Sequence, residues 1–108
     1  MEWEIRYYSK QIQREIRKFP PDVQAQTDRI VKLLEKFGPV EIPGKTKQWE
    51  GEVWEITANS RSGWGRVMYI AMDGDVIWLL YAFLKKTNTT PEHIAREVRK
   101  RAKEVKNA

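Results

Sequence analysis

The sequence contains no cysteine and only one histidine among its 108 residues. Without cysteine the chain has no disulfide, no thiolate nucleophile and no cysteine-based metal site. A single imidazole also leaves no histidine cluster that could bind a metal ion. The lack of disulfides fits a reducing compartment, so we expect a cytoplasmic protein that uses neither a metal nor another cofactor.

Long apolar runs are absent as well. No window approaches the roughly 18 consecutive apolar residues that a membrane span requires, and the N-terminal "MEWEIRYYSK" lacks the apolar core of a signal peptide. The composition of 41% apolar and 32% charged residues is typical of a globular protein. A chain of this length supports one modest core, so we expect a single domain over residues 1–108 with no membrane contact.

Several catalytic motifs are missing too. The sequence contains no Walker loop, no glycine-rich dinucleotide fingerprint and no HExxH motif, which argues against the common nucleotide and zinc-peptidase sites. A serine nucleophile needs a nearby base, and the only imidazole, that of His93, lies at the start of the last predicted helix. Hydrolases built on a catalytic triad are therefore set aside.

The positive charge is concentrated at the C-terminal end. The net charge is +5, and residues 1–84 hold 12 Lys/Arg against 12 Asp/Glu, whereas residues 85–108 hold 8 against 3. A basic block of this kind can bind phosphates, although a Lys/Arg-rich terminal helix is often only a solvated face. Both interpretations of the terminal helix stay open at this point.

Hydrophobic spacing predicts a strand and two helices in the first part of the chain. The segment "EWEIRYY" alternates bulky and charged residues, as a half-buried strand does. Ser9 is the predicted N-cap of a first helix that Pro20 and Pro21 terminate, and Gly38 ends a second helix. Its predicted buried stripe comprises Val23, Thr27, Ile30, Leu33, Leu34 and Phe37.

The second part is predicted to hold three strands and a closing helix. Residues 40–51 are assigned to a surface loop, followed by strands over 53–58, 64–72 and 76–84. Asp73-Gly74 predicts a two-residue hairpin turn, and Thr90 as N-cap with Pro91 as the first helical residue opens the last helix. The predicted fold is α+β: an N-terminal strand, a helical hairpin, a three-stranded antiparallel meander and a C-terminal helix, with the helices on one face of the sheet.

Cations gather at the strand ends of this predicted meander. They are Lys45, Lys47, Arg61, Arg66, Lys85 and Lys86. The start of the third strand lies beside the end of the fourth, so Arg66 and Lys85 are expected to be neighbours, with Arg66 opposite Tyr81. Such a cluster suits RNA cleavage, in which the 2′-hydroxyl attacks its own phosphate, because arginine binds phosphate oxygens and stabilises developing charge. The alternative is that Arg66 only pairs with Glu55 and that the two lysines merely end a strand in water.

The aromatic residues and the histidine allow similar alternatives. Trp54 and Trp78 fit the core, whereas Trp49 and Trp64 lie in loops or at strand edges and could stack on unpaired bases. His93 could act as an acid, although a helix N-terminus favours its neutral form. On the last helix, Arg99, Lys100 and Lys103 are candidate contacts to RNA phosphates.

Two segments, "GKTKQWEGEVWEI" and "GRVMYIAMDGDVIWLLYAFLKKTNTTPEHIAREVRKRAKE", resemble the HigB-type branch of the RelE toxin superfamily. The resemblance rests chiefly on an Arg-Val-x-Tyr strand and a Phe-x-Lys-Lys-Thr segment followed by proline. It implies a RelE-like fold and the toxin of a type II toxin–antitoxin system. Such a toxin is a metal-independent endoribonuclease that cleaves mRNA in the ribosomal A site, and a helix-turn-helix antitoxin holds it inactive.

The resemblance also implies roles for individual residues. Arg66 matches the phosphate-binding arginine of that group, Lys85 and Lys86 match its paired lysines, and Lys47 and Glu55 match its lysine and glutamate positions. The chain departs from the pattern at Thr57, where an arginine is usual, and Arg61 is a possible substitute.

Two rival functions remain. The ParE branch shares this fold and inhibits DNA gyrase without cleaving RNA, and a plain ribosomal-RNA-binding module would bind through the basic helix alone. A short helix-turn-helix protein in the adjacent reading frame would favour the toxin over the binding module.

Overall fold

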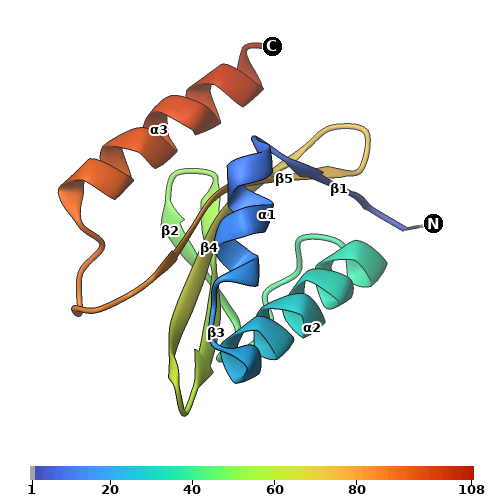
Figure 1. The fold of residues 1–108 in the computed structure, drawn as a ribbon. Coiled ribbons are helices and arrows are strands. Elements are labelled where there is room, and N and C mark those ends of the chain that lie inside the picture. Colours follow the sequence, from blue (N-terminus) through green and yellow to red (C-terminus); the bar gives the residue numbers. More distant parts are fainter. Residues whose placement is uncertain (1) are drawn as a thin grey trace.

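The computed structural model describes residues 2–108. In chain order the elements are β1 (Glu4–Tyr7), α1 (Lys10–Arg17), α2 (Pro21–Phe37), β2 (Thr46–Glu50), β3 (Val53–Ser60), β4 (Gly63–Met72), β5 (Val76–Leu84) and α3 (Glu92–Lys106), as Figure 1 shows. Among these residues no helix combines the length and the apolar character that crossing a membrane requires.

The five strands form one mixed sheet in the order β1-β5-β4-β3-β2. β1 runs parallel to β5, and every other neighbouring pair is antiparallel. β5 thus lies inside the sheet, as its "VIWLLYAFL" sequence predicts, because a strand covered on both faces is apolar on both.

β2 corrects the prediction of a loop over residues 40–51. Thr46 pairs with Ile56 and Lys47 pairs with Glu55, so the meander has four strands and not three. β2 is an edge strand whose only buried residue is Thr46, and its sequence "TKQWE" therefore shows no apolar alternation.

Helices cover both faces of the sheet, which corrects the prediction of one covered face. On one face α1 and α2 pack Ile16, Ile30 and their neighbours against the inward side chains of β3, β4 and β5. On the other face α3 packs Ile94, Val98 and Ala102 against the same three strands. Figure 1 shows α3 and the α1–α2 pair on opposite sides of the sheet.

The helix ends follow local chemistry, with small departures from the prediction. Ser9 is the N-cap of α1, but its side chain makes no capping hydrogen bond. α3 begins one residue later than predicted, with Pro91 and not Thr90 as its N-cap. The carbonyl of Pro91 accepts hydrogen bonds from the backbone amides of Ile94 and Ala95. Phe37 was expected in the core but is 58% exposed, whereas Leu34 in the same turn is fully buried.

The pairing of β4 with β5 differs from the predicted register by one residue next to the turn and by two residues at Arg66. Met72 pairs with Val76, because the turn holds Asp73, Gly74 and Asp75 with positive φ at the last two. A bulge at Met68 and Tyr69 adds the second shift. Arg66 consequently lies opposite Phe83 and not Tyr81.

Candidate active site

Three neighbouring strands place a lysine, a glutamate and an arginine near one another. Lys47 of β2 pairs with Glu55 of β3, and Arg66 of β4 pairs with Thr57, two residues further along β3. Because side chains alternate between faces, Glu55 and Arg66 lie on the same face as Val53 and Met68, which α3 covers. The polar side chains therefore continue the α3 face of the sheet beyond its apolar part.

Glu55 lies between two cations. Its Oε1 atom is 3.7 Å from Lys47 Nζ and 3.4 Å from Arg66 Nε. The side chains of Glu55 and Arg66 are only 1% and 8% exposed, whereas that of Lys47 is 61% exposed. The pairing of Arg66 with Glu55, expected as the alternative to a phosphate-binding role, is therefore present in the structure.

The guanidinium of Arg66 is held by its Nη1 atom. Nη1 donates to Oδ1 of Asn59 at 2.7 Å and to the carbonyl of Gly65 at 2.9 Å. Burial lowers the pKa of Arg66 and the carboxylate of Glu55 opposes that shift, but an arginine stays charged at neutral pH in either case.

Two buried polar atoms of the pair lack hydrogen bonds. Arg66 Nε and Glu55 Oε1 are buried and make no hydrogen bond in the described residues, although they form an ion pair at 3.4 Å. An unsatisfied buried polar atom typically costs about 1–3 kcal/mol, and such atoms are rare in folded proteins. Both atoms therefore keep hydrogen-bonding capacity, and a new partner reaches them once neighbouring side chains such as that of Lys47 move aside.

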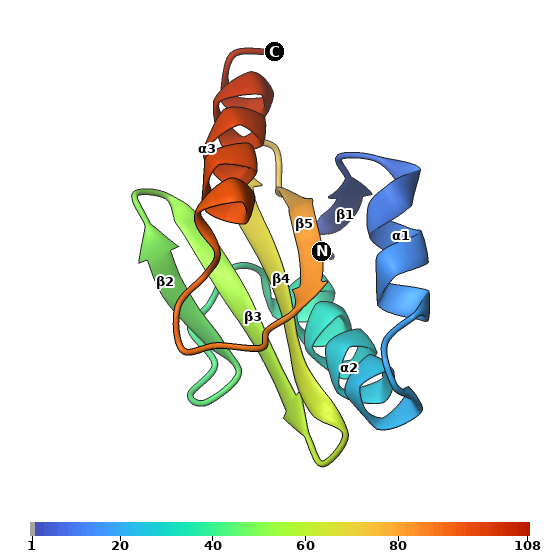
Figure 2. The same cartoon turned by 60° about the vertical axis from the view of Figure 1, so that its left-hand side comes forward.

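Lys85, Trp64 and Arg66 are brought together as the sequence predicts. The amide of Lys85 donates to the carbonyl of Trp64 at 2.8 Å, so Lys85 lies directly across from Trp64. Trp64 precedes Arg66 by two residues on β4 and is 47% exposed. In Figure 2 the connection from β5 to α3, which carries Lys85 and Lys86, crosses in front of β4 and β3. Lys85 is half-buried and Lys86 is exposed.

The remaining predicted residues surround this area or lie further away. The carbonyl of Lys45 accepts the amide of Thr57 at 2.7 Å, so Lys45 lies next to the position where an arginine was expected. Arg61 is exposed in the β3–β4 turn, roughly 13 Å along the strand direction from Thr57, and does not fill that position. His93 is exposed in the first turn of α3, and Lys100 and Lys103 are exposed further along it without an ion pair in the described residues.

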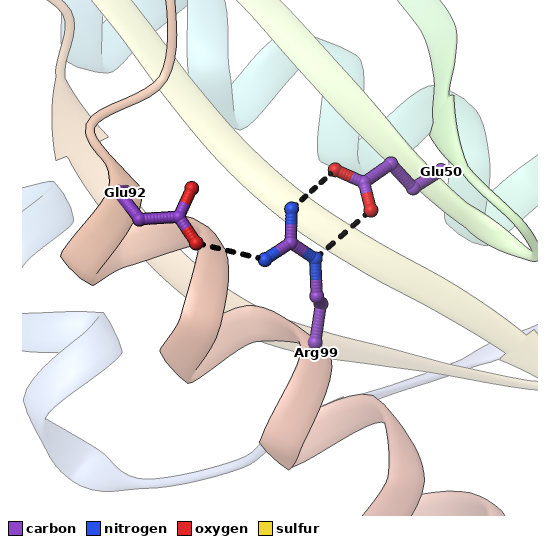
Figure 3. Close-up of polar contacts among 3 residues, drawn as sticks. All are labelled: Glu50, Glu92 and Arg99. Atoms are coloured by element: carbon purple, nitrogen blue, oxygen red, sulfur yellow. Dashed lines mark hydrogen bonds and ion pairs between the residues drawn. The ribbon is translucent and has the colours of Figure 1, made fainter.

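Arg99 has a role that sequence reasoning missed. Figure 3 shows its guanidinium bonded to both carboxylate oxygens of Glu50, at 2.9 Å each, and to Glu92 at 3.1 Å. The hydrogen bonds from Arg99 lower the pKa of Glu50, and those to Glu50 and Glu92 raise the pKa of Arg99. Arg99 also lies over the ring of Trp49, 5.6 Å from its centroid. Both Arg99 and Trp49 thus fasten α3 to β2, a contact between residues 49 positions apart that no local pattern reveals.

Glu55 and Asn59 were also underrated by sequence reasoning. Val53, Glu55, Thr57 and Asn59 share one face of β3, and a glutamate on a face that begins with a buried valine is a detectable signal of a buried polar site. Asn59 offered no such signal, because its contact with Arg66 depends on the register of β3 with β4.

The arrangement can bind an anion and accept a proton. A fixed guanidinium with nearby lysines binds phosphate oxygens, and a carboxylate with an unpaired oxygen accepts a proton from a hydroxyl placed next to it. Among residues 2–108, no group of three or more His, Cys, Asp or Glu side chains is arranged to hold a metal ion.

The architecture of the chain has a counterpart among solved structures. This α+β fold is similar to that of the YoeB-YefM complex from Staphylococcus aureus, with a TM-score of 0.57 and 14% sequence identity over 80% of this chain and 100% of that chain. At this identity the similarity shows the fold alone, and it agrees with the α+β architecture expected from the resemblance.

The family follows from the sequence itself. Residues 14–103 match the family described as "Phage derived protein Gp49-like (DUF891)", and the chain belongs to that family. No match was found among curated proteins. The assignment to the HigB type stays a prediction.

Proposed function

We propose that the protein is the toxin of a type II toxin–antitoxin system and an endoribonuclease that cleaves mRNA in the ribosomal A site. Membership of the Gp49-like family and the fold shared with YoeB support this proposal. The observation that carries it is the buried ion pair of Glu55 and Arg66, whose facing atoms make no hydrogen bond and which Lys47 joins at the solvent side.

The proposed reaction is an internal transfer of the phosphoryl group. Glu55 accepts the proton of the 2′-hydroxyl, and the 2′-oxygen forms a bond to the adjacent phosphorus as the bond to the 5′-oxygen breaks. Lys85 donates a proton to the departing 5′-oxygen, so the products are a 2′,3′-cyclic phosphate and a 5′-hydroxyl. Arg66 and Lys47 stabilise the additional negative charge on the phosphate, and Lys86 adds positive charge at the end of β5.

The remaining basic and aromatic residues are proposed to bind RNA. Trp64 is half-exposed beside Arg66 and offers a ring on which a base can stack. The set proposed to contact ribosomal RNA is Lys45, Arg61, His93, Lys100 and Lys103. Arg99 is proposed to act through the position of α3, because two carboxylates already compensate its charge.

A second protein is proposed to hold the toxin inactive. The structurally similar YoeB belongs to a complex with YefM, which supports a protein partner for this chain. We propose a helix-turn-helix antitoxin for that role.

The proposed function is tested by mapping mRNA 5′ ends after brief expression. Cuts in phase with codons, together with arrested translation, are expected. Intact mRNA with altered DNA supercoiling or DNA breaks would instead indicate a ParE-like gyrase inhibitor, and intact mRNA with protein bound to ribosomes would indicate a binding module without cleavage. Purified protein should cleave free RNA poorly, because a ribosome pre-aligns the 2′-hydroxyl for in-line attack.

A further inference from the structure

We infer that Asn59 is a positioning residue that keeps the Arg66 guanidinium from closing on Glu55 with a hydrogen bond. The buried Oε1 of Glu55 then keeps its hydrogen-bonding capacity for a substrate hydroxyl that displaces the side chains over it. This inference rests on the proposed function, since it assigns a role within that site. It concerns a contact that the sequence pattern does not predict.

β3 places a polar side chain on each side of the residue opposite Arg66. Arg66 lies opposite Thr57, and Glu55 and Asn59 flank Thr57 on the same face of the strand. The guanidinium therefore has a carboxylate toward one end of the strand and a carboxamide toward the other. Thr57 has a short side chain, which leaves the space between them to Arg66.

The distances show which neighbour the guanidinium contacts more closely. Nη1 donates to Asn59 Oδ1 at 2.7 Å, whereas Nε is 3.4 Å from Glu55 Oε1 and makes no hydrogen bond to it. An arginine and a carboxylate buried together normally form close, charge-assisted hydrogen bonds. The open contact between Arg66 and Glu55 is thus the unusual feature of the site, and the bond to Asn59 accounts for it.

The strand pair that carries Asn59 is itself fixed. The amide of Ser62, in the β3–β4 turn, donates to Oδ2 of Asp22 at 3.0 Å, and Oδ1 of Asp22 accepts the amide of Val23 at 2.9 Å. The start of α2 therefore anchors the turn that follows Asn59. The second bond of Nη1, to the carbonyl of Gly65, keeps the guanidinium on the same side.

A neutral acceptor suits this role. A carboxamide oxygen orients the guanidinium without neutralising it, so the positive charge stays available to phosphate. If Asn59 is truncated to alanine, Nη1 loses one of its two partners and the guanidinium can move toward Glu55. The carboxylate oxygen would then be occupied by Arg66 and less able to accept a proton.

The first test reads the position of Arg66 directly. In Asn59→Ala the Nε–Hε resonance of Arg66, followed by proton–nitrogen NMR of the free protein, should shift as Nε pairs with Glu55, and Glu55→Gln in addition should abolish that shift. Asn107→Ala, which removes an exposed carboxamide outside the site, should leave the resonance in place. An unchanged Arg66 resonance in folded Asn59→Ala overturns the inference.

The second test reads the reaction. Single-turnover cleavage of ribosome-bound mRNA by Asn59→Ala should fall about tenfold, with the acid limb of its pH–rate profile moved to lower pH and ribosome binding unchanged. Asn59→Asp keeps an acceptor for Nη1 and should show the parent's acid limb at a lower rate, because its charge offsets that of Arg66. A uniform loss of rate in Asn59→Ala with the parent's pH profile overturns the positioning role. If Asn59→Ala fails to fold, an acid limb of Asn59→Asp that departs from the parent's overturns it instead.

Failure of the proposed function and failure of this inference give different results. If the parent protein does not cleave ribosome-bound mRNA, or if Arg66→Ala cleaves as the parent does, the proposed function fails. The NMR comparison still decides whether Asn59 positions Arg66, because it needs no substrate.

Discussion

The two faces of the sheet differ in what fills them. On the α1–α2 face the contacts are apolar and close: a Cβ atom at Gly65 would lie 2.6 Å from Cγ1 of Val23 and 3.2 Å from Cε2 of Phe19. On the α3 face the apolar contact covers only part of the strands, and Glu55, Arg66 and Asn59 occupy the rest. One face thus stabilises the fold, and the other holds the polar groups to which we assign the proposed reaction.

The two faces also hold their helices differently. α1 and α2 pack almost wholly through apolar side chains, whereas α3 adds charged contacts at its rim. Arg99 bonds to Glu50 of β2, and Arg101 bonds to the carbonyl of Leu80 at 2.7 Å and to Glu97 at 2.8 Å. The difference predicts separate responses of the two faces to mutation, pH and salt.

The largest effect on stability is expected on the α1–α2 face. Ile30 is fully buried there, so Ile30→Ala should lower the free energy of unfolding by about 2–5 kcal/mol through lost burial and the cavity left behind. Val40→Ala is the matched control, because Val40 is 47% exposed and should change stability little. Urea unfolding measures both, and equal losses in the two variants would contradict the contrast.

Alkaline pH should weaken the same face. Burial raises the pKa of Tyr69 to about 12, above its ordinary value of 10.0. The folded state therefore binds the proton more tightly than the unfolded state, and the stability from this group is complete below pH 10 and is lost as pH rises toward 12. Urea midpoints at pH 8 to 11 should fall less in Tyr69→Phe than in the parent protein; identical slopes would assign the loss to other groups.

Acid pH should act on the opposite face. The hydrogen bonds from Arg99 lower the pKa of Glu50 below its ordinary value of 4.5, so this stabilisation is complete above pH 4.5 and is lost as pH falls through the lowered value. The effect is small, because both side chains are nearly half exposed. The protection factors of α3 amides, which are corrected for the pH dependence of intrinsic exchange, should fall at acid pH in the parent, and those of Glu50→Gln should already be lower at neutral pH. The same fall in α2 would show that the effect is not confined to this face.

The smallest structural effect is expected from the exposed lysines of α3. Replacing Lys100 and Lys103 with glutamine should leave stability unchanged and weaken ribosome association, with a shallower salt dependence because fewer counterions are released. Arg99→Gln should instead accelerate hydrogen exchange in α3. Cosedimentation across a salt series measures the first effect. An unchanged salt slope in the double lysine variant would remove both lysines from the proposed interface.

The contrast between the faces explains what could be predicted from the sequence. The residue ranges of α2 and β5 could be predicted, because the buried residues of α2 recur at helical spacing and β5 is a continuous apolar run. β2 escaped detection because an edge strand with one buried residue carries no such period. The register of β4 with β5 depended on a three-residue turn and a bulge, which the Asp73-Gly74 signal did not distinguish from a tight turn.

The site was predictable only in part. Hairpin pairing brings Arg66, Trp64 and Lys85 together, and this followed from strand order alone. The buried pairing with Glu55 was weighed as an alternative and is present together with the expected lysines. The contacts of Asn59 with Arg66 and of Arg99 with Glu50 join separate elements at atomic distances, which no sequence period records.

The central claim is that Arg66 stabilises the transition state of RNA cleavage. We would measure single-turnover cleavage of ribosome-bound mRNA and ribosome cosedimentation for Arg66→Ala, with Arg29→Ala on α2 as an exposed arginine control outside the site and unfolding curves to establish that each variant is folded. Arg66→Ala should cleave about a hundredfold more slowly, equivalent to roughly 3 kcal/mol, while ribosome binding persists. If Arg66→Ala cleaves as the parent does, or loses binding in proportion to activity, Arg66 is only the buried partner of Glu55 and the claim is wrong.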